Sequence, residues 1–414
     1  MSNLTSTSLS ESLPPSALLA DSDASRIDGI APALAVKPQS EDELLEVLRA
    51  CNARAAAVVP WGGGTHMHLG MPLARYDVAI DLTVLDTVLE YEPADLTVSV
   101  QAGMRFADLQ RLLGQNGQWL PLDPPADEEA TIGGILAINA SGPGRAVYGT
   151  ARDLLIGIAV ATPEGETVRA GGRVVKNVAG YDLGKLHIGA LGTLGVITRA
   201  SFKVSPLPEV MRTVETASAD PKALLSIAGE ARRRGLALNR LVLSRQSAAD
   251  EWRLLLRLAG GAAAVESSQH RLDELAAANG ASFAPADESV WSQLSAFTKQ
   301  ADVVAKAAVM PSVTSAILDR LKSLDAAIVA YPTAGIVYGT WQASAVAADS
   351  LKDLRSLCAQ TGRGALVLEK APTELRVAID VWAETRGDFS LMRSLKDKFD
   401  PAGILNPGRF VGGI

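Results

Sequence analysis

The sequence is poor in the residues that build metal centres, since its 414 residues include two cysteines and four histidines. Cys51 and Cys358 stand far apart, and no Cys-x-x-Cys pair occurs. This excludes an iron–sulfur cluster or a zinc ribbon held by this chain alone. Two free thiols are typical of a reducing compartment, and a disulfide between them is the less favoured alternative.

An excess of positive charge is also absent. Lys and Arg total 39 against 46 Asp and Glu, for a formal net charge of -7. No basic surplus is therefore available to displace the counterions of a nucleic acid. The triplet Arg232-Arg233-Arg234 precedes Gly235 at the end of an expected helix, where cations suit the helix dipole. We expect no nucleic-acid partner.

Long apolar runs are missing too. No segment is apolar for long enough to cross a membrane, and residues 1–25 contain no Lys or Arg of the kind that opens a signal peptide. We expect residues 1–26 to be a flexible lead. The expected location is the cytoplasm, with contact to the inner face of the membrane only through partners. The length predicts two domains.

Glycine, by contrast, is clustered after an expected strand at residues 58–61. The run Gly62-Gly63-Gly64-Thr65 predicts a nest of backbone N–H groups that binds phosphate, with the Thr65 hydroxyl as a further donor. It is not a Rossmann fingerprint, because Met67 stands where the last glycine would be. An ordinary tight loop is the alternative, and the cluster alone does not decide between them.

A second glycine-rich region spans residues 119–205. Its motif Thr131-Ile132-Gly133-Gly134 opens an apolar helix that ends at Asn139. A glycine pair there lets a flat ring lie against the backbone, near the positive end of the helix. Close packing of helix on sheet is the alternative, which this motif alone favours. With the first cluster, the region predicts a site for a flavin dinucleotide.

Several polar residues near these glycines have more than one interpretation. His66 and His68 could suggest a metal pair, but two ligands on a loop are too few, so we expect them to line a pocket and expect no metal. The position of His66 does not require a covalent bond to a flavin. The loop-like stretch with Lys176-Asn177 and Tyr181-Asp182 could bind a ligand or seal a domain interface.

The pattern changes after Pro206-Leu207-Pro208, which marks a domain boundary. Beyond this boundary, the order strand, helix, strand, strand, helix, strand is expected to occur twice. This predicts an antiparallel sheet with helices on one side. The expected strands are 210–216, 236–243, 252–258, 303–310, 326–331, 335–341 and 364–370, and the expected helices lie near 222–234, 264–279, 287–297, 312–324 and 346–360.

With these residues in view, the sequence resembles the FAD-binding family of p-cresol methylhydroxylase and vanillyl-alcohol oxidase. The resemblance covers most of 27–207 through the ordered glycine motifs, and returns in the tail Asp400-Pro401-Ala402-Gly403-Ile404-Leu405-Asn406-Pro407-Gly408. It implies an α+β fold. A two-part FAD-binding PCMH-type domain would span 27–207, and a cap of ferredoxin-like βαββαβ character would span 208–385. A C-terminal segment, 386–414, would return to the FAD domain.

The resemblance also implies FAD as the cofactor and gives its contacts by position. They fall on backbone glycines and on a few polar side chains. The implied residues are Gly62, Gly63, Gly64 and Thr65 at the pyrophosphate, with His66 beside them; Pro124, Thr131, Gly133, Gly134 and Asn139 along the flavin and ribityl chain; Gly142, Tyr148 and Gly149 at the border of the same groove; the backbone of Gly195, Val196 and Ile197 at the adenine end; and Asn406 near the isoalloxazine.

Within the family, the sequence is most similar to the smaller, E-type subunits of bacterial glycolate oxidases. The stretches 173–183 and 189–195 carry this match, and Ala190-Leu191 replaces the Ser-Glu usual in the larger catalytic subunits. The resemblance implies an accessory subunit that works with a larger catalytic flavin subunit and an iron–sulfur subunit. It would support or relay electrons while the complex converts glycolate to glyoxylate.

The cap departs from the pattern of the catalytic members, which gather histidines over the flavin. No histidine follows His270, so a base for the 2-hydroxyl proton is missing from its expected place and no catalytic residue is assigned. One alternative is a stand-alone 2-hydroxy-acid dehydrogenase that uses Tyr331, Tyr338, Lys370 or an arginine of the cap. Another is a structural subunit that has lost FAD.

Overall fold

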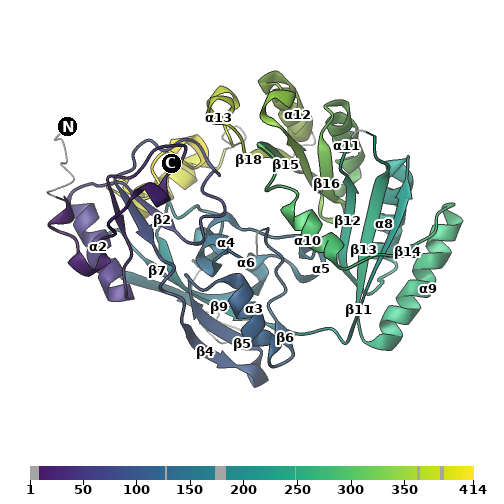
Figure 1. Ribbon diagram of the computed structural model, residues 1–414, viewed down its shortest axis with the longest axis horizontal. Helices are drawn as coiled ribbons and strands as arrows, with labels where there is room; N and C mark the ends of the chain where they lie inside the picture. The colour runs from purple at the N-terminus through teal and green to yellow at the C-terminus, as the bar shows by residue number, and fades with distance from the viewer. Residues whose placement is uncertain (1–8, 126–127, 173–182, 248, 361–363, 383–386) are drawn as a thin grey trace. The chain divides into compact units, whose positions relative to one another are not determined.

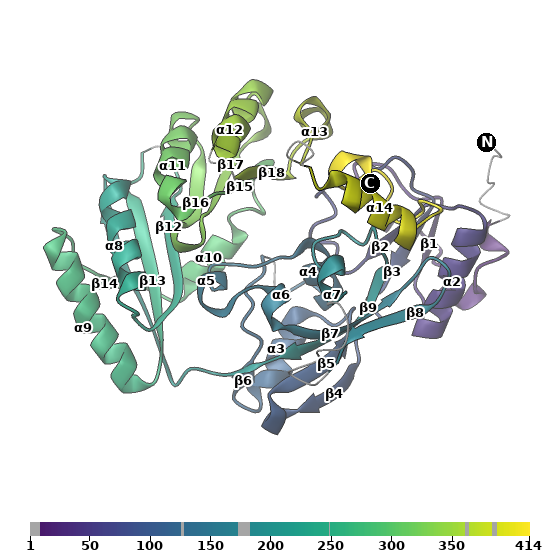
Figure 2. The same cartoon turned by 180° about the vertical axis from the view of Figure 1, so that it is seen from behind.

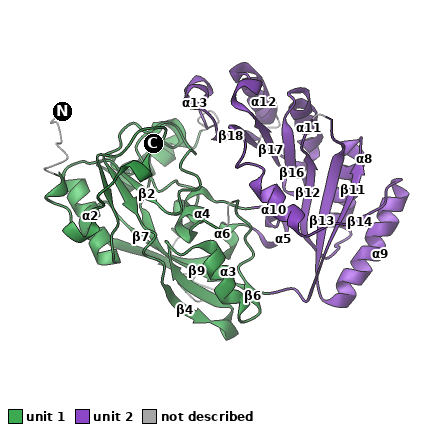
Figure 3. Ribbon diagram, in the orientation of Figure 1, with its two compact units in different colours: residues 1–141, 150–206, 384–414 green, residues 142–149, 207–383 purple. Residues whose placement is uncertain are grey.

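The computed structural model describes residues 9–125, 128–172, 183–247, 249–360, 364–382 and 387–414 (Figure 1). The chain divides into two compact units, which Figure 3 shows in different colours. Unit 1 contains Met1–Ser141, Thr150–Pro206 and Glu384–Ile414, and unit 2 contains Gly142–Gly149 and Leu207–Ala383. No helix among the described residues combines the length and the apolar character that crossing a membrane requires.

Unit 1 is built on two sheets with different strand directions. The first is parallel and has the order β1 (Leu34–Val36), β3 (Val78–Asp81), β2 (Val58–Trp61). The second is antiparallel and has the order β4 (Val88–Glu92), β5 (Thr97–Gln101), β9 (Val196–Lys203), β7 (Leu155–Ala161), β8 (Thr167–Gly171). A further two-residue pair joins β6 (Gln118–Trp119) to β10 (Ser205–Pro206).

Helix α2 (Glu41–Ala53) shows how the sequence sets a local structure. Its N-cap Ser40 accepts a hydrogen bond from the Glu43 N–H at 3.2 Å, as the capping box predicts. In a capping box the Glu43 carboxylate would accept from the N–H of Ser40, but here it accepts from the N–H of Gln39. Cys51 is buried where α2 packs on the parallel sheet, and this burial raises the pKa of its thiol to about 12.

Five further α-helices lie in the described part of unit 1, including the short helices α6 (Ala151–Leu154) and α7 (Gly184–His187). Helices α3 (Phe106–Gly114) and α4 (Ile132–Ile138) bury apolar side chains in the core beside the antiparallel sheet. Helix α14 (Phe389–Phe399) opens the C-terminal segment, which Figures 1 and 2 both show in yellow beside β2. Leu405 forms a parallel bridge with Val58 of β2, so the tail extends the edge of the parallel sheet.

Unit 2 is one antiparallel sheet of eight strands, with the order β14-β11-β13-β12-β16-β17-β15-β18. Each half has the expected order strand, helix, strand, strand, helix, strand, although the last strand of the first half, β14, was not among the strands expected from the sequence. The halves are β11 (Val210–Ser218), α8 (Pro221–Arg233), β12 (Leu238–Arg245), β13 (Trp252–Gly260), α9 (Ala262–Ala278), β14 (Ala284–Pro285), and β15 (Val303–Ala308), α11 (Thr314–Ser323), β16 (Ala327–Tyr331), β17 (Ile336–Trp341), α12 (Ala348–Gln360), β18 (Ala365–Lys370).

The two faces of this sheet are covered differently. Figures 1 and 2 show α8, α9, α11 and α12 on one face and α10 (Ser289–Ala296) on the other. Val242 and Leu255 are paired in register and pack with Trp291 of α10. Side chains alternate between the faces of a strand, so the residues two positions away share the α10 face. A short helix, α13 (Thr373–Ile379), follows β18.

The segment Gly142–Gly149 belongs to unit 2 although the sequence before and after it belongs to unit 1. Its short helix α5 (Arg145–Tyr148) lies against β12. The Tyr148 hydroxyl accepts a hydrogen bond from Asn239 Nδ2 at 3.0 Å, and Arg232 Nη1 donates to the Ala146 carbonyl at 2.9 Å. At least one arginine of the basic triplet therefore has a structural contact within unit 2.

Candidate cofactor site

Two neighbouring hollows lie in unit 1 and share part of their walls. The space between the walls is about 640 Å³ in the first hollow and about 410 Å³ in the second, and both figures include space that is open to solvent. The shared lining residues are Pro60, Gly62, Thr131, Gly134 and Ala137.

Beyond the residues that they share, the two hollows are lined by different parts of the chain. The first continues along the loop after Gly62 and reaches the C-terminal tail, while the second reaches the start of β9. Most of the cofactor contacts that the sequence predicts line one hollow or the other. Those in the first are Gly63, Gly64, Thr65, His66, Pro124 and Asn406, those in the second are Gly133, Gly195, Val196 and Ile197, and Gly62, Thr131 and Gly134 line both.

The loop after β2 is packed too closely for side chains. A Cβ on Gly62 would lie 2.1 Å from Thr131 Oγ1, and one on Gly63 would lie 1.8 Å from the Glu129 carbonyl oxygen. Gly64 has φ +70°, which favours glycine. Among the described residues, the N–H groups of Gly62, Gly63 and Gly64 donate to no protein acceptor. They are available to an anion, as in a phosphate-binding nest.

The glycine pair at the start of α4 serves two purposes. Thr131 is the N-cap and accepts from the Gly134 N–H at 3.3 Å. The Gly133 N–H donates to the Ala102 carbonyl at 2.7 Å, and a Cβ on Gly133 would lie 3.0 Å from the Ala102 Cβ. Gly133 therefore allows close packing on the chain after β5, while Gly134 lines both hollows.

The second hollow ends at a turn before β9. Gly192 and Gly195 have φ of +68° and +153°, and a Cβ on Gly195 would lie 2.4 Å from Val160 Cγ1. Behind this turn, His187 is buried and stacks edge to face with Phe399, with ring centroids 5.8 Å apart. Burial lowers the pKa of His187 to about 4.

His187 makes the stability of the protein depend on pH. Its folded-state pKa lies below the ordinary value of 6.5, so the unfolded chain binds more protons as the pH falls. The stabilisation is complete above pH 6.5 and is lost as the pH falls towards 4. Lowering the pH from 7 to 5 is expected to cost about 2 kcal/mol through this residue. Urea unfolding of the His187→Gln variant should show a correspondingly weaker pH dependence, and an unchanged dependence would contradict this assignment.

Asn406 brings the tail to the first hollow. Its backbone N–H donates to the Val58 carbonyl at 2.9 Å, and its Nδ2 donates to the Leu191 carbonyl at 2.6 Å. These contacts fix the amide, whose Oδ1 is buried and has no hydrogen-bond partner among the described residues. An acceptor in this position suits a ligand that carries an N–H or O–H donor, which the flavin ring and the ribityl chain both have.

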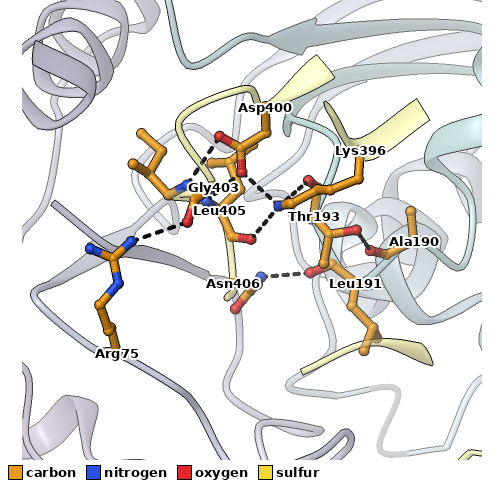
Figure 4. A network of polar contacts seen from close by, with 10 residues as sticks. Arg75, Ala190, Leu191, Thr193, Lys396, Asp400, Gly403, Leu405 and Asn406 are labelled. Carbon is orange, nitrogen blue, oxygen red and sulfur yellow. Dashed lines mark hydrogen bonds and ion pairs between the residues drawn. The ribbon is translucent and has the colours of Figure 1, made fainter. Parts of the chain in front are cut away.

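A buried ion pair holds the tail in place (Figure 4). Lys396 Nζ donates to Asp400 Oδ2 at 2.6 Å and to the carbonyls of Thr193 and Leu405 at 2.9 Å each. Asp400 also accepts from the N–H groups of Ile404 and Leu405. Burial lowers the pKa of Lys396, and the Asp400 carboxylate opposes that shift. The network joins the tail to the turn beside the second hollow.

The remaining predicted residues lie elsewhere. Asn139 ends α4 with φ +53°, next to residues that line the first hollow. Gly142, Tyr148 and Gly149 belong to unit 2, so their contact with a flavin stays a prediction. Residues 173–182, with the Lys176-Asn177 and Tyr181-Asp182 pairs, lie outside the described residues.

The rings of His66 and His68 are 5.7 Å apart, and His66 Nδ1 lies 3.0 Å from Thr65 Oγ1. Within the described ranges, no cluster of three or more His, Cys, Asp or Glu side chains has the geometry of a metal site.

Sequence reasoning missed other residues of the first hollow. Met67 and Leu69 gave no signal, whereas Arg409 directly follows the tail motif.

In unit 2, the strands that differ from the catalytic pattern carry a polar cluster. Lys306 Nζ lies 2.8 Å from Glu369 Oε1 and 5.5 Å from the centre of the Tyr338 ring. The rings of Tyr331 and Tyr338 are 5.7 Å apart. Lys370, which the sequence suggested as a cap residue, donates instead to the Lys299 carbonyl. Lys306 is the lysine that accompanies the two tyrosines.

Comparison with known families agrees with this geometry. Residues 32–171 match the model of an FAD binding domain, and residues 382–410 match the C-terminal domain of FAD linked oxidases. The site in unit 1 draws on both segments, since Gly62 and Thr131 come from the first and Asn406 from the second. FAD is the cofactor that these matches indicate, as predicted from the sequence.

Similar proteins include flavin enzymes that act on hydroxy acids. Glycolate oxidase subunit GlcD of Bacillus subtilis (strain 168) is 34% identical over 44% of this chain and 39% of its own length. Glycolate oxidase subunit GlcE of Escherichia coli (strain K12) is 34% identical over 45% and 53%. The mitochondrial D-lactate dehydrogenase [cytochrome] of Arabidopsis thaliana is 36% identical over 43% and 31%. The matched segments thus span about half or less of each relative.

The fold itself has neighbours among solved structures. The structure of p-cresol methylhydroxylase with bound substrate superposes with a TM-score of 0.76 at 16% identity, over 98% of this chain and 96% of that one. Alkyldihydroxyacetonephosphate synthase gives a TM-score of 0.74 at 19% identity, over 98% and 86%. The predicted fold class, an FAD-binding domain of the PCMH type with an antiparallel-sheet cap, is confirmed.

Proposed function

We propose that this chain, which resembles FAD-linked oxidases in its flavin site, is an FAD-binding accessory subunit of a glycolate oxidase complex. It would support or relay electrons from a larger catalytic flavin subunit to an iron–sulfur subunit while the complex converts glycolate to glyoxylate. The two glycolate oxidase subunits among its relatives support glycolate as the substrate and a complex of several subunits. The buried thiols Cys51 and Cys358 suit the cytoplasm, with membrane contact through partners.

The residues that line the two hollows of unit 1 suit the binding of FAD. The N–H groups of Gly62, Gly63 and Gly64 would hold the pyrophosphate, and Asn406 Oδ1 would accept from a donor of the flavin or ribityl chain. Bound FAD would supply reversible redox chemistry, which no amino-acid side chain of the site provides. The chain itself would bind and orient the cofactor.

The observation that carries the proposal is the contrast between this site and the cap. The sequence contains no histidine after His270, so the strands that carry histidines in catalytic members carry Tyr338 and Glu369 here. Glu369 is paired with Lys306 at 2.8 Å, so its carboxylate already has a partner. A general base for glycolate is best sought in the larger subunit.

The proposal is tested with the purified chain and its neighbours. We expect the isolated chain to contain bound FAD and to show no glycolate oxidation with an artificial electron acceptor. Adding the larger flavin subunit should restore turnover. A colourless chain that takes up no added FAD would refute the cofactor assignment, and turnover of glycolate by the isolated chain would refute the accessory role.

A second candidate, a stand-alone 2-hydroxy-acid dehydrogenase, is favoured by the Lys306–Glu369 pair. An ammonium group suits a substrate carboxylate, and a neighbouring carboxylate could take the hydroxyl proton. If the isolated chain turns over glycolate or lactate, Glu369→Gln should abolish that turnover. Lys370→Met is the matched control on the same strand, since Lys370 donates to the Lys299 carbonyl instead of pairing with Glu369.

A further inference from the structure

We propose that Arg409 is a positioning residue of the cofactor site, which holds the loop after the glycine nest in its binding conformation and places a positive charge at the wall of the first hollow. The inference rests on FAD as the ligand of that hollow. It concerns a side chain that sequence reasoning did not assign. Arg409 is 5% exposed and lines the first hollow.

The guanidinium of Arg409 spans the loop that continues from Thr65. Its Nη2 donates to the Met67 carbonyl at 2.6 Å and to the Leu69 carbonyl. Its backbone carbonyl accepts from the Met71 N–H at 2.9 Å. Three contacts from one residue therefore fix the carbonyl and N–H directions over residues 67–71, two of which, Met67 and Leu69, line the hollow themselves.

Gly70 shows how closely the loop packs against Arg409. Its φ is +106°, and a Cβ there would lie 2.8 Å from the Arg409 carbonyl oxygen and 3.4 Å from Arg409 Nε. The loop thus approaches Arg409 as closely as a backbone can. Such an approach fits a loop whose shape is set by the arginine beneath it.

The charge of Arg409 adds a second effect. The guanidinium places a positive charge at the wall of the first hollow. In a hollow of low polarity this charge attracts an anion more strongly than it would in water. FAD carries a pyrophosphate, and the nest of Gly62, Gly63 and Gly64 lines the same hollow. Arg409 and the nest are therefore expected to act on the same anionic ligand.

Arg75 offers a matched control for this role. It also joins the tail to unit 1 through two carbonyls, with Nη1 donating to Ala55 at 2.9 Å and Nη2 to Gly403 at 3.2 Å. Arg75 is exposed, however, and is not among the residues that line either hollow. A variant at Arg75 loosens a comparable tail contact without changing the charge at the cofactor.

The test measures FAD affinity by flavin fluorescence on the full-length apoprotein, for four variants. Arg409→Met and Arg409→Gln are expected to weaken binding at least tenfold, because both remove the charge, although Gln keeps a donor for one carbonyl. Arg409→Lys keeps the charge but lacks the planar guanidinium that spans the two carbonyls, so its affinity should lie between those of the wild type and Arg409→Gln. Arg75→Met should match wild type. The thermal shift on adding FAD should follow the same order.

Each outcome has one interpretation. Equal affinity of wild type and Arg409→Gln overturns the proposal, as does an equal loss in Arg409→Met and Arg75→Met, which would show a general effect of the tail. If Arg409→Met does not fold, Arg409→Gln and Arg409→Lys still separate charge from folding. A wild-type chain that binds no FAD would contradict the cofactor instead, which distinguishes that failure from the failure of this inference.

Discussion

Replacing Lys396 with methionine is expected to lower the free energy of unfolding of unit 1 by about 3–5 kcal/mol, among the larger losses that one substitution causes. The change leaves the Asp400 carboxylate, whose side chain is 0% exposed, without its cation at 2.6 Å. It also removes the two hydrogen bonds from Lys396 to the carbonyls of Thr193 and Leu405. The tail would then lose its tie to the turn beside the second hollow.

Urea unfolding measures this effect, with Lys398→Met as the control. Lys398 is on the same helix but exposed, so its substitution should change stability by no more than about 0.5 kcal/mol. The double variant Lys396→Met with Asp400→Leu should be more stable than Lys396→Met alone, because it no longer buries an unpaired charge. If Lys396→Met unfolds like Lys398→Met, the buried pair does not hold the tail.

The second large effect is a loss of FAD affinity, which we expect when Gly63 is replaced. A Cβ there would lie 1.8 Å from the carbonyl oxygen of Glu129, a backbone atom that cannot turn aside as a side chain can. Even Gly63→Ala must therefore displace the nest from the segment that leads to Thr131. We expect FAD affinity to fall by about a hundredfold or more, which corresponds to roughly 2.7 kcal/mol.

Gly114→Ala provides the comparison. Gly114 ends α3, and a Cβ there would meet nothing within 4 Å, so this variant should bind FAD as the wild type does. Equilibrium dialysis or the flavin content after purification measures both variants. Wild-type FAD content in Gly63→Ala would contradict the role of this loop in holding the cofactor.

Much of unit 2 could be predicted because its elements are long and amphipathic. Alternation of apolar residues gave β11, β13 and β17 within a few residues of their observed ends, and helical periodicity gave α8 and α12. The two-residue strand β14 carries no periodic signal and was missed. Short elements held by their neighbours lie beyond what a local pattern can show.

The site was predictable where its chemistry is local. The run from Gly62 to Thr65 and the pair Gly133-Gly134 are sequence motifs, and all of these residues line a hollow. The different roles of Gly133 and Gly134 could not be predicted, because the role of Gly133 depends on its contact with Ala102, which is distant in the sequence. The contacts of Arg409 with residues near 67–69 depend in the same way on how the tail folds back.

The surroundings of Tyr148 and of the cap tyrosines could not be read from the sequence, because they depend on which segments of the chain lie together in the fold. The family resemblance implied that Tyr148 borders the flavin groove, which stays a prediction; the sequence did not show that Gly142–Gly149 folds with unit 2, where Tyr148 accepts from Asn239. The cap cluster was partly anticipated through Tyr331 and Tyr338. The lysine beside them is Lys306 of β15, a strand distant from both in sequence but paired with β17 in the sheet.

The proposed function requires a chain that holds FAD but leaves glycolate oxidation to a partner. Anaerobic mixing of glycolate with the isolated, FAD-loaded chain, followed by absorption spectroscopy, tests this most directly. The flavin should stay oxidised until the larger flavin subunit is added, and should then be reduced. Reduction of the flavin by glycolate in the isolated chain would contradict the account.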